Sequence, residues 1–595
     1  MTAPDEVLNI APQDGDKLRS KALTADVDEL PEGYYRSPRL IATFFSIALN
    51  LVATYFAFEA SAAAISSIIE DVGASKNASL FSTVWTTGQA ICILLMGRLT
   101  DRFGRRPFFM VTNAFGLIGG VIACTAKSME TLIGAQVLLG ISAGQGGASP
   151  LFVGELMSNK HKFIGAVIIA FPNVIATGFS PVIGQTLGNN GNWRWIYYIY
   201  LIAMAIASLL AFLFYHPPSF IQLHGKKINK RQELARVDWI GVFLLTAGLT
   251  LFLLGVSWGG QLDSAWNSSK ILGLLISGAV TLILFVLYEC FANVERPIIP
   301  MKFFRDLRGF TCLVIISSTM GVMNLALFIM YPQQVVYIFG SSLSGWREVA
   351  WMSSTAAFGI WAGILILGSL FHVIRHIRWQ LFAVAVWEVA FLGAMTAVDR
   401  HHKTSAIVFS FFTGFVVGFA EDVTMLVVQY IVDDEDLGVA FAIVAGSRSV
   451  FGSMLTAAFI SLYTNKLPGQ LKLKLIPAVS KAGLPESSLP GLLNAVAAGT
   501  PQAIAVVPGM TPALLKVTTD AVADSYAASY AYVYYFAMAL GVLAIIAGLC
   551  LRDFDRYMTN HVPHQIYKKS DTDKDPLDSS SSSHCSSEKV LANEK

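Results

Sequence analysis

The sequence contains little charge for its length. Only 14% of its 595 residues are Asp, Glu, Lys or Arg, and 54% are hydrophobic, whereas about a quarter of a soluble domain is charged. Mean hydropathy is +0.57. This shortage of charge excludes a series of soluble domains and a disordered chain. Because the net charge is only +2, no overall field attracts nucleic acid, and an integral membrane protein remains.

The sequence also lacks the patterns of a metal site, a disulfide framework and a secretory leader. Its six cysteines have no CxxC or other ligand-like spacing. With no nucleophile–base or metal arrangement in the sequence, we expect no metal and no enzyme. Residues 1–38 are polar, and the apolar run that starts near Leu40 is too long for a cleaved leader. We expect this run to act as a signal anchor that leaves the N-terminus in the cytosol.

The sequence has instead a series of long apolar runs. A helix needs about 20 mostly apolar residues to cross a bilayer, and the even number of such runs places both termini on one side. They predict an all-α integral membrane protein with fourteen spans, near residues 40–62, 80–98, 108–126, 131–155, 164–187, 193–215, 239–258, 271–290, 309–331, 348–371, 379–398, 405–430, 437–462 and 528–550.

Lysine and arginine are unevenly divided between the two sides of these spans. With the N-terminus inside, the short inside loops contain seventeen of them and the short outside loops seven, which predicts cytosolic termini. We expect the protein to lie in the plasma membrane, with the vacuolar membrane as the alternative location. The glycosylation sequons at Asn77 and Asn267 fall on the predicted outside. Residues 463–527 are predicted to form a large outside loop that can carry short helices, and the serine-rich residues 551–595 a disordered cytosolic tail.

A short polar turn separates the second and third spans. It combines two glycines, one aspartate and three arginines, namely Gly97, Asp101, Arg102, Gly104, Arg105 and Arg106. The glycines allow close helix approach and positive φ angles. The aspartate can face a helix N-terminus or pair with an arginine, in a contact that breaks when two halves of a molecule rock. We therefore predict a gating loop.

This turn resembles the signature loop of the major facilitator superfamily at nearly every defining position. The resemblance implies two pseudo-symmetric six-helix bundles, residues 40–215 and 309–550, around a mid-membrane cavity that opens alternately to each face. Fourteen spans resemble the drug:proton antiporter branch, whose central loop and two extra helices would lie within residues 216–308. Residues 1–39 then form a cytosolic N-terminal tail.

Three further stretches resemble the fungal trichothecene efflux pump family, which neighbours the siderophore-iron transporters. They are residues 154–162, residues 193–198 and residues 436–467. The resemblance covers about residues 40–550 and implies efflux, without indicating a substrate.

The fifth span resembles the helix-bending motif of the antiporters. Its Gly178, Pro181 and Gly184 fall at positions of that motif, whereas Ser180 and Gln185 stand where the motif usually has glycines. In the fourth span, Gln136 stands where the superfamily often has a buried arginine. That arginine is therefore not available here for proton coupling.

Few ionisable residues lie deep in the spans, and these are Glu59, Glu388, Glu421, Asp422 and Arg448. Such groups are costly in a bilayer and mark functional sites. A carboxylate in a low-dielectric cavity can exchange protons near neutral pH, so we interpret these residues as candidates for proton coupling. Because Glu421 and Asp422 lie about 100° apart on a helix, we expect one to face the cavity and the other to pair with Arg448. The alternatives are a structural ion pair and, for Glu388, a position near the membrane interface.

Uncharged polar side chains within the spans are candidates for the substrate cavity. They are Asn50, Tyr55, Gln89, Gln136, Gln145 and Asn324. Because such groups also join packed helices, a helix–helix contact is the alternative for each of them.

These features together favour a fungal carrier that exports small amphipathic toxins, drugs or secondary metabolites. We expect the proton gradient to drive it, without a cofactor. The alternatives are a siderophore-iron importer on the same fold and a transport-inactive nutrient sensor. The expected partners are the lipid bilayer and a small-molecule substrate, without nucleic acid, and the expected state is a monomer.

Overall fold

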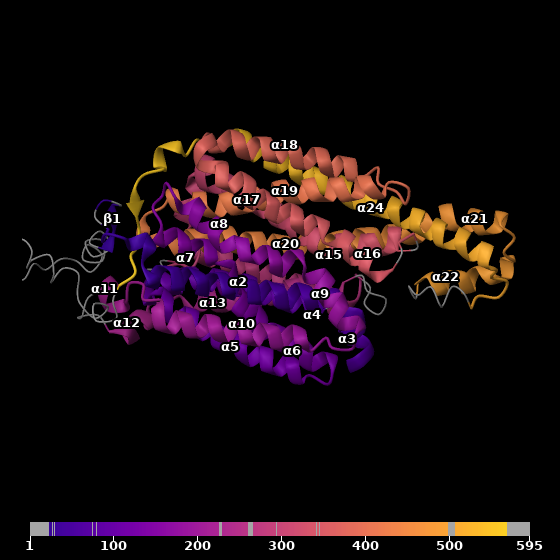
Figure 1. Cartoon of the computed structure of the whole chain (residues 1–595), viewed down its shortest axis with the longest axis horizontal. Coiled ribbons are helices and arrows are strands. Elements are labelled where there is room, and N and C mark those ends of the chain that lie inside the picture. The colour runs from indigo at the N-terminus through magenta and orange to yellow at the C-terminus, as the bar shows by residue number, and fades with distance from the viewer. Residues whose placement is uncertain are drawn as a thin grey trace, which may run out of the picture.

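The computed structural model describes residues 23–567, apart from residues 27, 29, 74, 76, 79, 225–228, 260–265, 293, 295, 341, 344 and 498–505. Within this part of the chain, fourteen helical segments are long and apolar enough to cross a membrane. The predicted all-α membrane fold is therefore confirmed. The helices form two halves (Figure 1), and a further pair of helices lies beside them.

The N-terminal half contains the first six spans. They are α2 (Pro38–Ala63), α4 (Leu80–Phe103), α5 (Arg105–Thr125), α6 (Met129–Gly147) continued by α7 (Ser149–Leu156), α8 (Lys162–Asn173) continued by α9 (Ser180–Asn189), and α10 (Trp195–Phe214). Within this half α4 packs on α6, α2 on α10 and α5 on α6. The short helix α3 (Ile65–Val72) follows α2. The Ser37 and Ser128 hydroxyls accept backbone hydrogen bonds in the first turns of α2 and α6, which satisfies amides that a helix start leaves free.

The C-terminal half contains the last six spans. They are α15 (Cys312–Phe339), α16 (Trp346–Ser353) continued by α17 (Thr355–Ile374), α18 (Ile377–Met395), α19 (Lys403–Val427), α20 (Leu437–Gln470) and α24 (Pro512–Cys550). Here α17 packs on α19, α15 on α20 and α18 on α24. The two halves meet along two seams, where α20 packs on α4 and α17 packs on α8.

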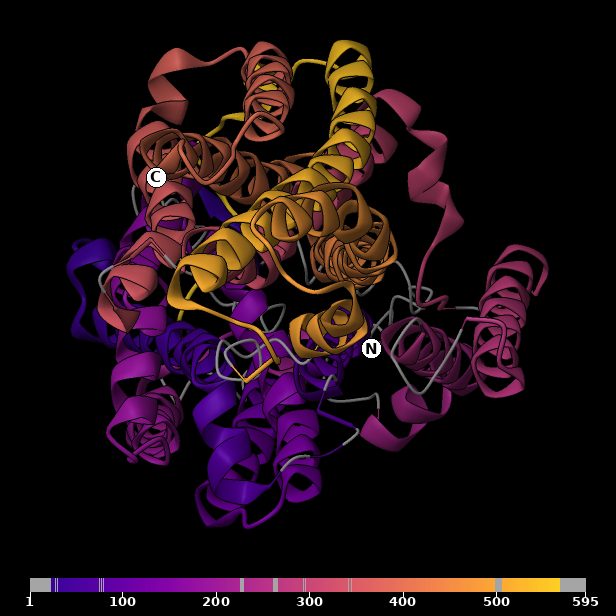
Figure 2. The same cartoon turned by 90° about the vertical axis from the view of Figure 1, so that its right-hand side faces the viewer.

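Two additional spans lie between the halves in the sequence and beside them in space. Helices α13 (Trp239–Trp258) and α14 (Ser269–Phe291) pack against each other, and α13 also contacts α4 and α20. Figure 2 shows this pair at the side of the bundle. The short helices α11 (Phe220–His224) and α12 (Lys230–Ala235) precede them. Because only 17% of the apolar window of α14 is buried, we expect this helix to face lipid.

The fifth span is interrupted at its predicted bending motif. Pro172 removes a backbone donor near the end of α8, a π-helical turn follows at Val174–Gly178, and Pro181 lies in the first turn of α9. A Cβ atom on Gly184 would lie 2.2 Å from the Ala60 carbonyl oxygen. Only glycine therefore allows α9 to approach α2 this closely.

The first and last described segments meet on one face of the molecule, here called the terminal face. Strand β1 (Ala25–Asp26) pairs antiparallel with strand β2 (His561–Val562), so that Ala25 lies opposite Val562. An even number of spans returns the chain to the face where it began, as the sequence predicts.

The predicted disordered tail over residues 551–595 is wrong for residues 551–567. This segment lies ordered across the terminal face, with the side chains of Leu551, Phe554 and Val562 fully buried. The serine-rich composition that suggested disorder begins further along the chain. Residues 568–595, and with them the predicted disorder there, lie outside the described residues.

The opposite face, here called the far face, carries a helical projection (Figure 1). Most of the predicted loop over residues 463–527 is helical, because both flanking spans continue past the membrane. Helix α24 has 39 residues, a length of about 58 Å at 1.5 Å per residue, whereas the hydrocarbon core is about 30 Å thick. Between α20 and α24 lie a π-helical turn and two short helices, Leu471–Leu475, α21 (Ile476–Lys481) and α22 (Leu489–Ala497).

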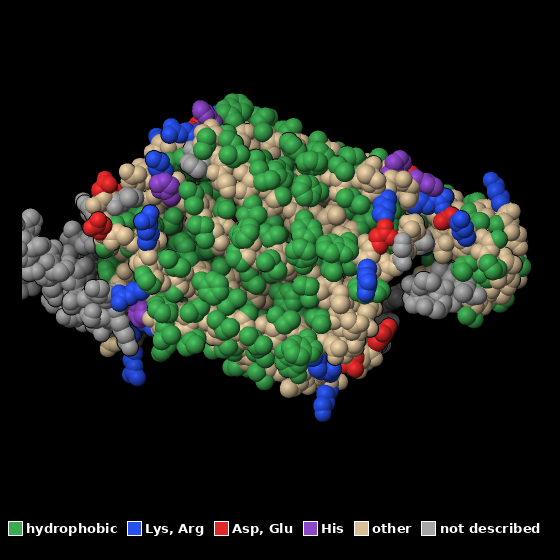
Figure 3. All heavy atoms as spheres, in the orientation of Figure 1, with side chains coloured by type: hydrophobic (Ala, Val, Ile, Leu, Met, Phe, Trp, Pro, Cys, Tyr) green, Lys and Arg blue, Asp and Glu red, His purple; other side chains and the backbone are tan. Residues whose placement is uncertain are grey.

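The outer surface between the two faces is hydrophobic. Figure 3 shows apolar side chains over the middle of the molecule and charged side chains gathered towards its two ends. Such a belt matches the hydrocarbon core of a bilayer. The 14% of charged residues therefore lie mainly where the chain meets water.

A candidate substrate cavity between the two halves

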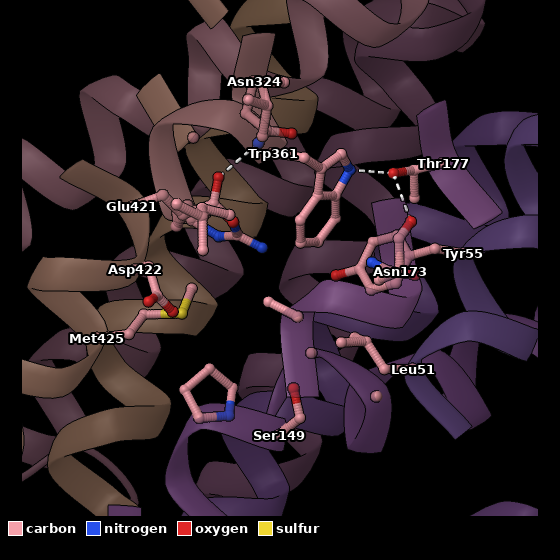
Figure 4. Close-up of a pocket in the computed structure, with 18 of the residues that line it drawn as sticks. Leu51, Tyr55, Ser149, Asn173, Thr177, Asn324, Trp361, Glu421, Asp422 and Met425 are labelled. Atoms are coloured by element: carbon pink, nitrogen blue, oxygen red, sulfur yellow. Dashed lines mark hydrogen bonds and ion pairs between the residues drawn. The ribbon is translucent and has the colours of Figure 1, made fainter. Parts of the chain in front are cut away.

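A cavity of about 1090 Å³ lies at the centre of the molecule, between the two halves. In Figure 4, residues of the N-terminal half line one side and residues of the C-terminal half line the other. The lining residues include Tyr55, Phe58, Glu59, Trp85, Gln89, Asn173, Thr177, Asn324, Phe328, Trp361, Glu421, Asp422 and Arg448.

Aromatic rings form much of the apolar wall. Phe58 stacks on Trp85 with ring centroids 3.9 Å apart and an interplanar angle of 7°, and Tyr55 meets Trp85 edge to face. Phe328 and Trp361 line the cavity from the C-terminal half. Broad flat walls with a few fixed polar groups suit a compact, largely apolar ring system.

One buried ion pair connects two helices of the C-terminal half. The Arg448 guanidinium of α20 pairs with the Glu421 carboxylate of α19, and the Asn324 side-chain amide of α15 donates a hydrogen bond to the same carboxylate. Arg448 also interacts with the Tyr55 hydroxyl of the opposite half, which accepts a hydrogen bond of 3.2 Å from Gln89. The structure thus places Glu421, and not Asp422, as the partner of Arg448.

Two further carboxylates line the cavity without a cationic partner. The Glu59 carboxylate accepts a hydrogen bond from the Ser180 hydroxyl at an O···O distance of 2.8 Å. One Asp422 carboxylate oxygen is buried without a hydrogen-bond partner. Within the described chain, neither residue forms a salt bridge. An ionised carboxylate in such surroundings is stable only while water can reach it.

A hydrogen bond across the cavity joins the two halves. The Trp361 indole N–H of α17 donates to the Thr177 hydroxyl, which in turn donates to the Asn173 carbonyl oxygen at 3.0 Å (Figure 4). Thr177 lies in the π-helical turn of the fifth span. Sequence reasoning missed Trp361 and Thr177, because a tryptophan or threonine in an apolar span has no distinctive pattern. The only signal was the proximity of Thr177 to the bending motif.

Four predicted site residues lie outside this cavity. Asn50 and Gln136 are fully buried and hydrogen-bond to other helices of the N-terminal half, and Gln145 is fully buried within α6. Glu388 is fully buried in the C-terminal half, and neither carboxylate oxygen has a hydrogen-bond partner within the described chain. Glu388, a candidate for proton coupling, therefore does not line the cavity. The sequence cannot tell which neighbour a helix face meets, whereas Tyr55, Gln89 and Asn324 do line the cavity.

The cavity is continuous with a vestibule on the far face. The vestibule has about 3520 Å³ of empty space and shares Phe58, Glu59 and Phe328 with the cavity. It extends outward past Trp258 of α13 and Tyr463 of α20. Glu59 therefore lies where the cavity meets the vestibule.

The gating loop closes the terminal face. The Asp101 carboxylate accepts hydrogen bonds from the backbone N–H groups of Gly438 and Val439, at N···O distances of 3.1 and 2.9 Å. It also pairs with Arg105 at 2.7 Å, and Arg105 binds Glu155 of α7. Both predicted contacts of the aspartate, a helix N-terminus and an arginine, are therefore present. The contact to α20 joins the two halves.

The other residues of the gating loop also contribute to the closed contact between the two halves. A Cβ atom on Gly97 would lie 2.5 Å from the Ala442 Cβ atom, so glycine lets α4 and α20 touch. Gly104 has a φ of 85°, which glycine adopts without strain. Arg106 donates to a carbonyl of α10, and the Arg102 carbonyl accepts a hydrogen bond from α11. The loop is thus held by α10 and α11, while Asp101 binds the C-terminal half.

Other groups of interest lie away from the cavity. The predicted sequons at Asn77 and Asn267 are exposed, and Asn77 borders the vestibule. In the described part of the chain, no group of three or more His, Cys, Asp or Glu side chains could hold a metal ion.

Two helical halves around a central cavity, closed on one face by an aspartate–arginine turn, define a membrane transporter of the major facilitator fold. Among solved structures, a bacterial homolog of the human lysosomal transporter Spinster, inward-facing and unoccupied, is 15% identical with a TM-score of 0.48, covering 86% of this chain and 98% of that one. The human organic anion transporter MFSD10 is 12% identical with a TM-score of 0.45, covering 85% and 100%.

The chain belongs to the fungal trichothecene efflux pump (TRI12) family, whose profile matches residues 1–594. It is 64% identical to the trichothecene efflux pump TRI12 of Trichoderma arundinaceum, over 100% of both chains. It is 56% identical to the trichothecene efflux pump TRI12 of Fusarium sporotrichioides, over 98% of each chain. These relatives confirm the predicted family.

Proposed function

We propose that this protein exports trichothecenes from the fungal cytosol across the plasma membrane, by alternating access and in exchange for protons. The substrate class rests on two of its relatives, which are both trichothecene efflux pumps. The observation that carries the mechanism is the central cavity, which has aromatic walls and two carboxylates without cationic partners. Such a cavity can hold a compact ring system and, beside it, a carboxylate that takes up and releases a proton.

The terminal face is the cytosolic face in this proposal. The excess of lysine and arginine in the loops of that face supports this orientation. The structure is then closed to the cytosol and open to the outside, as it would be after release of the toxin. The protein acts as a monomer, with the proton gradient as its energy source and no cofactor.

Proton uptake at Glu59 allows the outer vestibule to close. The residue lies at the boundary of cavity and vestibule, and its only side-chain hydrogen bond within the described chain comes from Ser180, just after the bend of the fifth span. The ionised carboxylate needs water, since no cation neutralises it, and therefore opposes closure. Protonation from the outside removes this cost. The proton then moves inward with the cavity and leaves on the cytosolic side, where Asp422 is the second candidate proton site.

The experiment that tests this function is export of a labelled trichothecene from a toxin-sensitive yeast that expresses the full chain. Wild-type protein should lower the intracellular toxin and restore growth, and dissipating the pH gradient should remove both effects. The substitution Glu59→Gln, which keeps the side chain neutral, should abolish gradient-dependent export. The control is Glu388→Gln, which changes another buried carboxylate that lies outside the cavity and should leave the response to the gradient unchanged.

Two outcomes would contradict the proposal. Growth rescue on siderophore-bound iron, with no change in toxin level, would indicate the importer instead. Export by Glu59→Gln that still follows the pH gradient would remove Glu59 from the coupling mechanism.

A further inference from the structure

The segment 551–567, here called the C-terminal strap, is anchored at its start to the C-terminal half. Arg552 pairs with Asp306 at 3.0 Å. The Asp555 carboxylate accepts hydrogen bonds from the backbone N–H of His376, with both N···O distances 2.9 Å. His376 lies between α17 and α18 and has a φ of 55°, a left-handed conformation that is unfavourable for a residue other than glycine. The Asp555 carboxylate thus stabilises an otherwise unfavourable backbone conformation of His376.

The strap then crosses to the N-terminal half. The backbone N–H of Lys160 donates to the Thr559 carbonyl, and that of Asn159 donates to the His561 carbonyl, both at 3.0 Å. The Asn159 side-chain amide also donates to the Thr559 hydroxyl at 3.2 Å. Further along, the backbone N–H of His564 donates to the Glu155 carbonyl at 3.0 Å. The loop between α7 and α8 therefore binds the strap along its length.

Two histidines of the strap contact acidic groups at the closed gate. His564 Nδ1 lies 3.5 Å from a Glu155 carboxylate oxygen, and Glu155 binds the arginine that holds Asp101. His561 Nε2 lies 2.9 Å from the Asp434 carboxylate, in the loop before α20. The strap therefore touches both halves at the point where Asp101 joins them.

Little slack separates the two sets of anchors. Only residues 556–558 lie between Asp555, held by the C-terminal half, and Thr559, held by the N-terminal half. An extended chain covers at most about 3.6 Å per residue, so the two anchor points cannot separate by more than roughly 14 Å. An opening on this face that carries the anchor points further apart than this must pull one set of anchors free.

We propose that the C-terminal strap is a latch that holds the terminal face closed, and that it releases from the loop between α7 and α8 each time the cavity opens to that face. The inference rests on the alternating access of the proposed function, and adds a segment that controls one of its two steps. The strap stays on the C-terminal half, because its anchors there join it directly to α24. The release therefore frees residues 559–567 from the N-terminal half, beginning at the contact of Thr559 with Asn159 and including the pairing of β2 with β1.

A pair of disulfides tests which anchor must move. Cysteines at Asn159 and Thr559, whose side chains touch, should close a bond that fastens the strap to the N-terminal half. Oxidation should stop export, and a reductant should restore it. The matched pair, His376→Cys with Asp555→Cys, fastens the strap to the half on which it stays, and should leave export within about twofold of the single variants. Export that continues after complete oxidation of the first pair would overturn the latch, and a stop by the second pair alone would overturn the assigned release point.

A second measurement does not depend on the identity of the substrate. Ser149 lines the cavity near the terminal face, and modification of Ser149→Cys by a maleimide applied to inside-out vesicles reports opening to that face, with mass spectrometry of the peptide that contains the new thiol as readout. Adding Thr559→Val, which removes the hydrogen bond from the Asn159 amide of the N-terminal half, should raise the modification rate roughly fivefold, the effect of losing one neutral hydrogen bond. The control is Asn560→Ala, an exposed neighbour. Equal rates in both variants would overturn the latch, whereas failure of trichothecene export alone would affect only the proposed function.

Discussion

Replacing Asp101 by asparagine should open the terminal face. The carboxylate receives two backbone N–H groups at the start of α20 and the Arg105 guanidinium. Asparagine has nearly the same shape, but it carries no charge and only one of its two terminal atoms can accept. Its amide group would face either a backbone donor or the guanidinium. The contact between the halves is therefore lost in part, without a change in side-chain volume.

The size of the effect follows from these contacts. A hydrogen bond to a charged group contributes about 1.5–3 kcal/mol, and an anion at a helix N-terminus about 0.3–1 kcal/mol more. Asp101→Asn retains one neutral bond, so we expect the closed state to lose about 2–3 kcal/mol. At 1.36 kcal/mol per tenfold, the equilibrium shifts roughly 30- to 150-fold towards the state open to the terminal face.

The assay is the modification rate of Ser149→Cys from the terminal face, together with trichothecene export. The rate should rise, and export should fall because the outward-open state becomes rare. The control is Asp433→Asn, which removes the same charge from an exposed position near α20. Equal modification rates in the two variants would show that Asp101 does not hold the gate, and would refute the argument from its hydrogen bonds.

Two further substitutions test helix packing within each half. The measurement for both is the melting temperature of the purified protein. Glu421→Ala leaves Arg448 buried without its partner, which should cost about 3–5 kcal/mol. Adding Arg448→Met should recover much of that loss, and a double variant less stable than the single one would contradict the pairing. Gly184→Ala places a Cβ atom 2.2 Å from the Ala60 carbonyl oxygen and should cost about 1–3 kcal/mol. Gly134→Ala, where no atom lies within 4 Å, should leave the melting temperature unchanged or slightly higher.

The gating loop could be predicted from the sequence because its signal is local. Two glycines, an aspartate and three arginines within one turn restrict what the turn can do. The partner of Asp101 at the start of α20 lies 337 positions away, and no local pattern indicates it. Likewise the sequence located Glu421, Asp422 and Arg448 in the membrane, but the choice of Glu421 as ion-pair partner follows from how α19 and α20 pack.

The sequence by itself determined the membrane class, the fourteen spans, the common face of the two ends and the family. These follow from composition and from runs of apolar residues, which act over about 20 positions because a bilayer has a fixed thickness. Only the tertiary structure decided which polar side chains face the cavity, why Glu388 and Gln136 do not, and where residues 551–567 lie. Those outcomes depend on contacts between helices that are distant in the chain, and on the direction in which each helix face points. The charged residues show the same distinction. Their scarcity in the sequence indicates a membrane protein, whereas only the contacts that they make in the structure identify the gate.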